Sequence, residues 1–184
     1  MLRVTLVSGL PGYGPLPTAF PAEWGRLGRE GNVVKFETQL GTWVGNFKPG
    51  LGGVTRAGVN PNGRQAVVIA AGDLWVVNPD TRDGEFLLPA IDAALEVREP
   101  DGWIFSRQGL ALAQFGPEGI IWHTRRLSWD GFNQLSIGHG EVKGLAWSPL
   151  DDKWYPFRVD LGTGKSTGGS FGNEDAEGWE RCLS

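Results

Sequence analysis

The sequence predicts an all-β protein built of antiparallel meander repeats, each of about 40 residues. Three observations carry this prediction. Short apolar runs alternate with polar residues at the two-residue period of a β-strand. Glycine and proline, with 29 and 12 residues in a chain of 184, place turn signals between those runs. A proline-containing loop followed by two strands also recurs along the chain.

Residues 1–31 are predicted to form an irregular N-terminal segment with one strand and a short helix. Arg3 to Val7 alternates polar and apolar residues and ends at Ser8-Gly9, as a strand does. Leu10 to Pro21 is rich in proline, which fixes φ and lacks an N–H donor, so an irregular path is expected. Pro21 to Gly28 has proline at a first helical position and glycine at a stop position, which predicts a helix of about two turns.

The repeats are predicted to occupy residues 32–170, and a tail follows over residues 171–184. The expected strand pairs, in chain order, are 33–37 with 42–47, 65–70 with 74–77, and 103–106 with 110–115. Pro61 and Pro100 open the second and third of these pairs, and Pro149 opens a further copy. Because antiparallel strands joined by short loops have one apolar face to bury, each meander must pack on another.

The stretch from Arg126 to Lys165 shows the repeating unit most clearly. Gln134 to Ile137, Val142 to Trp147 and Trp154 to Leu161 are its three predicted strands, and short polar loops separate them. Phe157 to Thr163 also repeats the pattern of Trp75 to Thr81. We therefore expect the whole chain, residues 1–184, to form one β domain.

Several segments of this stretch carry a resemblance. Ser128-Trp129-Asp130-Gly131, residues 144–149 (GLAWSP), residues 152–157 (DKWYPF) and residues 159–164 (VDLGTG) are similar to segments of a group of bacterial proteins of about this size. The similarity extends upstream to residues 13–17, 43–47 and 49–53. This resemblance implies a bacterial origin, and it supplies no activity and no catalytic residues.

The repeats also resemble β-propeller blades, which are four-stranded meanders of about this length. A sandwich of two meander sheets is the alternative, because the first 30 or so residues do not follow the repeat and a closed propeller needs at least about four blades.

Charge and cysteine content exclude several classes of function. A formal net charge of −4 with 17 basic residues supplies no cationic field for a polyphosphate, so no nucleic-acid partner is expected. Cys182 is the single cysteine, which excludes an intramolecular disulfide. No signal peptide and no apolar span of about 20 residues is apparent. We expect a cytoplasmic protein with no membrane partner.

No motif specifies a cofactor, a metal or a nucleophile. Gly162 to Thr167 (GTGKST) lacks the first glycine of a phosphate-binding loop and is followed by two further glycines, so a hairpin turn is predicted there. His123 and His139 are the only histidines and have no cysteine near them in sequence, which disfavours zinc. We predict no cofactor, no metal and no catalytic residues.

Carboxylates and tryptophans are the remaining candidates. Asp130 is interpreted mainly as a turn residue and Asp151-Asp152 as an exposed loop, and Asp160 is a fourth acid of the same stretch. Paired acids in a tryptophan-lined cleft are also typical of glycoside hydrolases. Trp75, Trp103, Trp122 and Trp147 are predicted core rings. Trp129 and Trp154 flank charged residues at loop edges. The predicted binding residues are Trp129, Asp130, Trp154 and Tyr155.

The leading hypothesis is a non-enzymatic bacterial domain that binds a protein partner through its loops. One version is an immunity-type protein that neutralises a toxin, which small size, acidity and the lack of catalytic motifs favour. The alternative is a carbohydrate-binding or glycoside-processing protein with an aromatic cleft. Exposed tryptophans beside two facing carboxylates would favour this alternative.

Overall fold

The computed structural model describes residues 1–98 and 101–172. Over these residues the chain is all-β, which confirms the predicted fold class, and α1 (Ala22–Arg26) is its one helix. Helix α1 lies inside the predicted range Pro21 to Gly28, and its Trp24 is buried. Pro100, Cys182 and all but the first two residues of the predicted tail lie outside the described residues.

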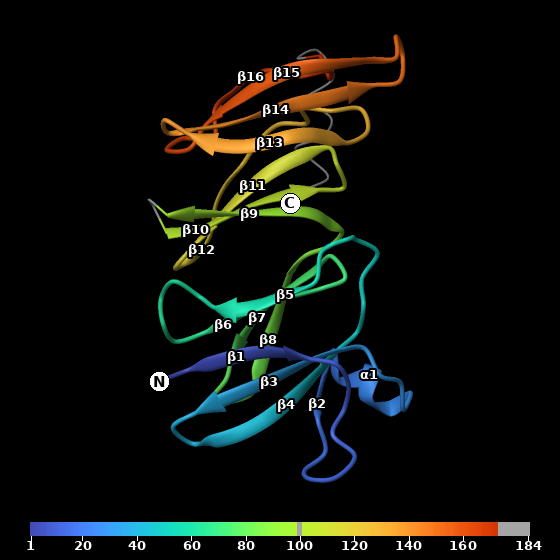
Figure 1. Cartoon of the computed structure of the whole chain (residues 1–184), viewed down its shortest axis with the longest axis vertical. Coiled ribbons are helices and arrows are strands. Elements are labelled where there is room, and N and C mark those ends of the chain that lie inside the picture. The colour runs from blue at the N-terminus through green and yellow to red at the C-terminus, as the bar shows by residue number, and fades with distance from the viewer. Residues whose placement is uncertain (99–100, 173–184) are drawn as a thin grey trace. The chain divides into compact units, whose positions relative to one another are not determined.

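The strands form four sheets of four strands, named A to D here and shown in Figure 1. The chain divides into two compact units, Met1–Ile91 (unit 1) and Asp92–Ser184 (unit 2). Unit 1 contains sheets A and B, and unit 2 contains sheets C and D, with the boundary at the start of β9. The single domain expected from the sequence stays a prediction.

Unit 1 combines one irregular sheet with one meander. Sheet A has the order β1-β3-β4-β2, and sheet B has the order β5-β6-β7-β8. The bounds are β1 (Arg3–Val7), β2 (Thr18–Phe20), β3 (Asn32–Thr38), β4 (Gly41–Phe47), β5 (Arg56–Val59), β6 (Ala66–Ala70), β7 (Asp73–Asn78) and β8 (Asp83–Leu88). The predicted hairpins β3–β4 and β6–β7 both form. Strand β2, in the proline-rich segment, pairs in parallel with β4, which the sequence did not predict.

Unit 2 consists of two meanders. Sheet C has the order β12-β11-β10-β9, and sheet D has the order β13-β14-β15-β16. The bounds are β9 (Ile91–Arg98), β10 (Asp101–Arg107), β11 (Ala111–Gly116), β12 (Gly119–His123), β13 (Phe132–Gly138), β14 (Glu141–Ser148), β15 (Lys153–Asp160) and β16 (Ser166–Gly168). All three strands predicted in the stretch from Arg126 to Lys165 are present, in the predicted antiparallel order.

Each unit buries an apolar core formed by the facing sides of its two sheets. The core of unit 1 is aromatic: Phe36 stacks on Trp43 with ring centroids 4.1 Å apart, and Phe20 stacks on Phe47 at 4.5 Å. Trp75 joins this cluster from sheet B with 7% of its surface exposed, which confirms it as a core ring. The core of unit 2 is mainly aliphatic and contains Val97, Ile104, Leu112, Leu127, Val142, Ala146, Phe157, Val159 and Leu161.

The same turn follows the third strand of sheet B and of sheet D. Asn78 ends β7 and its Oδ1 accepts the N–H of Asp80 at 3.0 Å. Asp160 ends β15 and its Oδ1 accepts the N–H of Thr163 at 2.8 Å. In each turn the fifth residue donates its N–H to the carbonyl of the first, from Arg82 to Asn78 at 2.9 Å and from Gly164 to Asp160 at 2.8 Å.

A tryptophan from the other sheet of the unit holds each of these turns. The indole N–H of Trp43 donates to Pro79 O at 2.8 Å, and that of Trp122 donates to Leu161 O at 2.9 Å. The turn at the end of Phe157 to Thr163 thus matches the turn at the end of Trp75 to Thr81, and the repeat itself stays a prediction. The prediction that Pro149 opens a copy of the repeat as Pro61 does was wrong, however. Pro149 precedes β15, the third strand of its sheet, whereas Pro61 precedes β6, the second strand of its sheet.

Candidate protein-binding face

The four predicted binding residues all lie around one end of sheet D. Trp129 and Asp130 precede β13, and Trp154 and Tyr155 begin β15. Trp147, predicted as a core ring, lies at the same end on β14 and is half-buried. The core prediction for Trp147 was wrong in its choice of face, because buried Val142 and Ala146 occupy the alternate positions of β14.

Trp147 and Trp154 form a pair on the side of sheet D that faces away from the core of unit 2. They are directly opposite each other in the β14–β15 register, with ring centroids 5.1 Å apart. The next pair on the same face is Leu145 opposite Pro156. We call these four residues the aromatic face. Trp154 is 41% exposed, so the aromatic face presents apolar surface to solvent. Its residues lie on two strands that pair without a bulge.

The backbone at Trp147 is held by several hydrogen bonds. Its N–H donates to Gly131 O at 3.1 Å, and its carbonyl accepts from the hydroxyls of Ser128 at 3.2 Å and Ser170 at 2.5 Å. The N–H of Trp129 lies 3.2 Å from the same carbonyl. The aromatic face is therefore fixed to a rigid support, which lowers the conformational entropy lost on binding.

Trp129 belongs to that support. Its ring meets Phe171 edge-on with centroids 4.6 Å apart, and the Arg126 guanidinium lies over both rings, at 5.2 Å and 4.3 Å from their centroids. Arg126 also donates from Nη2 to Trp129 O at 2.9 Å. The half-buried Trp129 ring thus packs against its own chain. We therefore expect a substitution of Trp129 to act by changing the position of Trp147.

Asp130 and Tyr155 differ in their contacts. Asp130 is exposed, and its carboxylate makes no hydrogen bond or ion pair with another described residue, so the cap of this turn is supplied by the Ser128 hydroxyl bonded to Gly131 O at 2.7 Å. The Tyr155 hydroxyl donates to the Asp151 carboxylate. That bond raises the pKa of Tyr155 and is the main cause that lowers the pKa of Asp151.

Charged residues continue the same face of sheet D beyond the apolar pairs. Lys143 lies opposite Arg158, and Glu141 lies opposite Asp160. Lys143 Nζ is 3.0 Å from Glu141 Oε2. Hydrogen bonds from the Thr163 side chain and backbone lower the pKa of Asp160. Along the ladder the face thus changes from apolar to basic to acidic.

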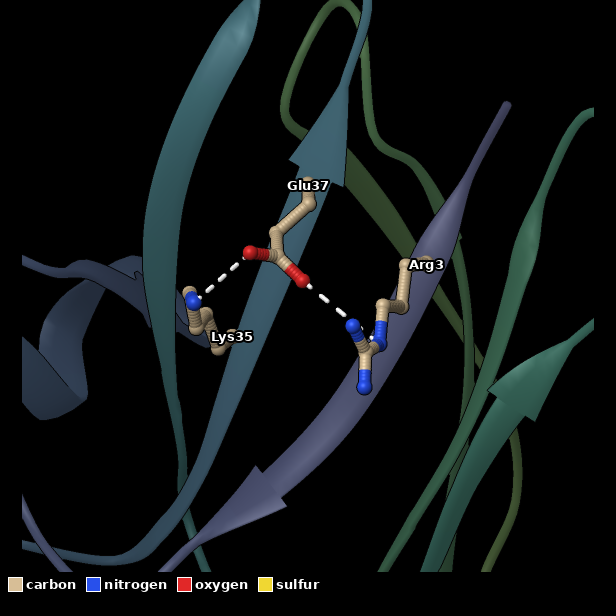
Figure 2. A network of polar contacts seen from close by, with 3 residues as sticks. All are labelled: Arg3, Lys35 and Glu37. Atoms are coloured by element: carbon tan, nitrogen blue, oxygen red, sulfur yellow. Dashed lines mark ion pairs between the residues drawn. The ribbon is translucent and has the colours of Figure 1, made fainter.

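The corresponding face of sheet A has a different character. Glu37 on β3 lies 2.7 Å from Lys35 Nζ and 3.7 Å from Arg3 Nε on β1, as Figure 2 shows. The Lys35 hydrogen bond is the main cause that lowers the pKa of Glu37. Core residues Val34 and Phe36 occupy the alternate positions of β3, so these charges lie on the side away from the core of unit 1.

Asp151 and Asp160, near the two ends of β15, do not have the raised pKa that a general acid needs. Asp151 and Asp160 both have lowered pKa values. Asp73 in unit 1 has a raised pKa because of its burial, against which the Ala90 N–H and the charge of Lys48 act. Proton donation near pH 7 requires a carboxyl pKa well above its usual range, so Asp151 and Asp160 are poor candidates for this role.

The remaining motifs have structural positions. Gly162 to Lys165 form the turn between β15 and β16, as predicted. His139 lies in the β13–β14 turn with a φ of 53°, and burial, followed by the charge of Arg107, lowers the pKa of His123 on β12. In residues 1–98 and 101–172 no three His, Cys, Asp or Glu side chains gather in a metal-binding arrangement. The short helix of this part of the chain could not cross a bilayer.

Comparison of the chain with protein-family models, with curated proteins and with solved structures finds no match. The assignment of the candidate site therefore depends on the contacts and burial of its own residues. Sequence reasoning missed Trp147 and Arg158 as face residues. The signal that places them is their alternation with Ala146 and with Phe157 and Val159, which are buried in the core of unit 2.

Proposed function

We propose that the protein is a non-enzymatic binding domain that docks a protein partner on the aromatic face of sheet D. The observation that carries the proposal is the pair formed by half-buried Trp147 and exposed Trp154 on a hydrogen-bonded ladder. Rings of this kind bury large apolar area at little entropic cost and are enriched among residues that dominate binding energy. The neighbouring cations add charge that a protein surface can complement.

Carbohydrate processing has less support. Hydrolysis of a glycosidic bond needs a protonated carboxyl group beside a second carboxylate, and Asp151, three residues before Trp154, has a lowered pKa. The two rings are also inclined to each other by 49°, so they do not form one flat platform for a sugar. A toxin-neutralising role is one specific form of protein binding, and a toxin gene beside this gene would support it.

The blade-like repeat is part of the same proposal. Sheets B, C and D are consecutive four-stranded meanders, and in two of them the third strand ends in the same tryptophan-held turn. Repeats of one meander supply a rigid scaffold on which one outer face can vary without loss of the fold.

The experiment compares wild type with Trp154→Ala and with Val44→Ala, a control on sheet A. A partner recovered on immobilised wild-type protein is identified and titrated against all three. Trp154→Ala should weaken binding by about 2 kcal/mol or more, as expected for a central aromatic anchor, while Val44→Ala should bind like wild type. Equal affinity of wild type and Trp154→Ala for this partner, with both proteins folded, would contradict the proposal.

A further inference from the structure

The outer face of sheet D carries one cation that no carboxylate of the described residues neutralises. Strands β14 and β15 contain three basic residues, Lys143, Lys153 and Arg158. Lys143 lies 3.0 Å from Glu141, and Lys153 lies 3.7 Å from Asp151. Arg158 is exposed and has no carboxylate within ion-pair distance among the described residues. Its guanidinium is therefore available to a partner.

The nearest acidic residue on the same strand face has other contacts. Asp160 is two positions along β15 from Arg158, but its Oδ1 accepts both the N–H and the hydroxyl of Thr163, at 2.8 Å and 2.7 Å. The Thr163 hydrogen bonds, and to a smaller extent the charge of Lys165, lower the pKa of this carboxyl group. The turn that ends β15 thus uses the carboxylate that would otherwise be closest to Arg158.

Arg158 lies on the same side of β15 as the aromatic face. Trp154, Pro156 and Arg158 are alternate residues of one regular strand, whose pairing with β14 has no irregularity. Alternate residues of a strand lie about 6.7 Å apart, so Arg158 is about 13 Å from Trp154 along the ladder. A planar guanidinium at this position can bind a carboxylate through two parallel hydrogen bonds.

We propose that the partner presents an apolar side chain to Trp147 and Trp154 and a carboxylate, about 13 Å away, to Arg158. This inference rests on the proposed function of the aromatic face and adds the chemistry of the partner. In an extended segment that runs along β15, the two groups are four residues apart. A protein carboxylate fits better than a nucleic-acid phosphate, because the chain carries a net charge of −4 that repels a polyanion.

Sheet A provides the control for this reading. Arg3 also lies on an outer sheet face, but Glu37 is 3.7 Å from its Nε, so its charge is already balanced within the chain. Reversing the charge at Arg3 changes the net charge by the same amount as reversing it at Arg158. Only the second change alters the face on which the partner docks.

A random peptide library displayed on phage tests the inference without a known partner. The library is selected against wild type, Trp154→Ala, Arg158→Glu and Arg3→Glu, each shown to be folded by circular dichroism. Wild type and Arg3→Glu should enrich peptides with an apolar residue four positions from Asp or Glu. Peptides selected on Arg158→Glu should carry Lys or Arg in place of that acid. The synthetic peptide that binds wild type most tightly should bind Arg158→Glu at least about 10-fold more weakly, as expected when a close charge pair is lost.

Two outcomes separate this inference from the proposed function. One outcome is that Arg158→Glu enriches the same acidic peptides as wild type while Trp154→Ala enriches none. The proposed contact between Arg158 and a carboxylate is then wrong, and the aromatic face still binds peptides. If wild type enriches nothing beyond Trp154→Ala, both the inference and the docking face are wrong.

Discussion

Units 1 and 2 share a tryptophan-held turn and differ in the outer face of one sheet. In unit 1 the turn Asn78–Arg82 receives the Trp43 indole, and in unit 2 the turn Asp160–Gly164 receives the Trp122 indole. In each unit, this indole hydrogen bond joins one sheet of the unit to the other sheet of the same unit. The shared turn belongs to the scaffold, because its hydrogen bonds join backbone carbonyls that are otherwise left at the end of a strand.

The outer faces of sheets A and D start from a similar arrangement. Each has a lysine and a glutamate two residues apart on its second strand, Lys35 with Glu37 and Glu141 with Lys143. On sheet A, Arg3 adds a second cation to the same glutamate (Figure 2). On sheet D, the adjoining positions are Leu145, Trp147, Trp154 and Pro156. This difference supports the proposal that a partner binds at sheet D, since a partly exposed apolar ladder contributes little to folding.

The largest expected effect separates core tryptophans from face tryptophans. Trp75→Ala should destabilise the protein by about 3–5 kcal/mol, because the ring contacts Phe20, Phe47 and Phe86 inside unit 1. Trp154→Ala should cost about 1 kcal/mol, since it loses mainly one aromatic contact, with Trp147. Chemical denaturation of both variants measures the two values. Equal losses would mean that Trp154 is a structural ring and that the faces do not differ as described.

A smaller effect tests whether the two turns are equivalent. Gly164 has a φ of 70°, and a Cβ at this position would lie 2.8 Å from the Trp122 ring. Arg82, at the same position of the other turn, has a φ of 64°, and its guanidinium lies 5.6 Å from the Trp43 ring centroid. Gly164→Ala should therefore destabilise by about 2 kcal/mol or more, from left-handed backbone strain and overpacking. Arg82→Ala, the matched variant, should cost below about 1 kcal/mol, the value of an exposed cation–π contact. Denaturation midpoints with the reverse order would show that the two turns pack differently.

The smallest effect concerns pH and the first residue of each turn. The pKa of Asp160 is lowered by its bonds to Thr163, so its stabilising contribution is present above the ordinary Asp value of about 3.9 and is lost as pH falls through the lowered pKa. Asn78 makes the equivalent bonds without a charge. Asp160→Asn should thus remove this acid-dependent part, and the stability difference from wild type should shrink below pH 4 or so. A difference that stays constant from pH 7 to acid would contradict the assignment.

The sequence predicted the hairpins well because their signals are local. Alternation and turn residues are enough to place β3–β4, β6–β7 and β14–β15. Two features depended on longer-range information. Strand β2 has three residues whose only ladder partner is β4, which is distant in sequence. Pro149 and Pro61 precede different strands of their sheets, so the proline alone could not set the phase of the third copy.

The predicted binding residues and the aromatic face differ in composition. Trp129 and Trp154 both lie at one end of sheet D, yet Trp129 packs under Arg126 and Phe171. Val142 to Trp147 contains apolar residues at both alternations, so its pattern alone does not say which face is buried. The role that we propose for Arg158 depends on the hydrogen bonds between Asp160 and Thr163, which pattern analysis does not show.

The central claim is that the aromatic face of sheet D is the surface that contacts a partner, and the indole N–H signals of the tryptophans test it most directly. In protein labelled with ¹⁵N, these signals are assigned by single Trp→Phe variants and followed as the recovered partner is added. We expect the signals of Trp147 and Trp154 to shift, while those of Trp43 and Trp122, bonded to Pro79 and Leu161, stay in place. Unchanged Trp147 and Trp154 signals at a partner concentration that saturates binding would contradict the claim.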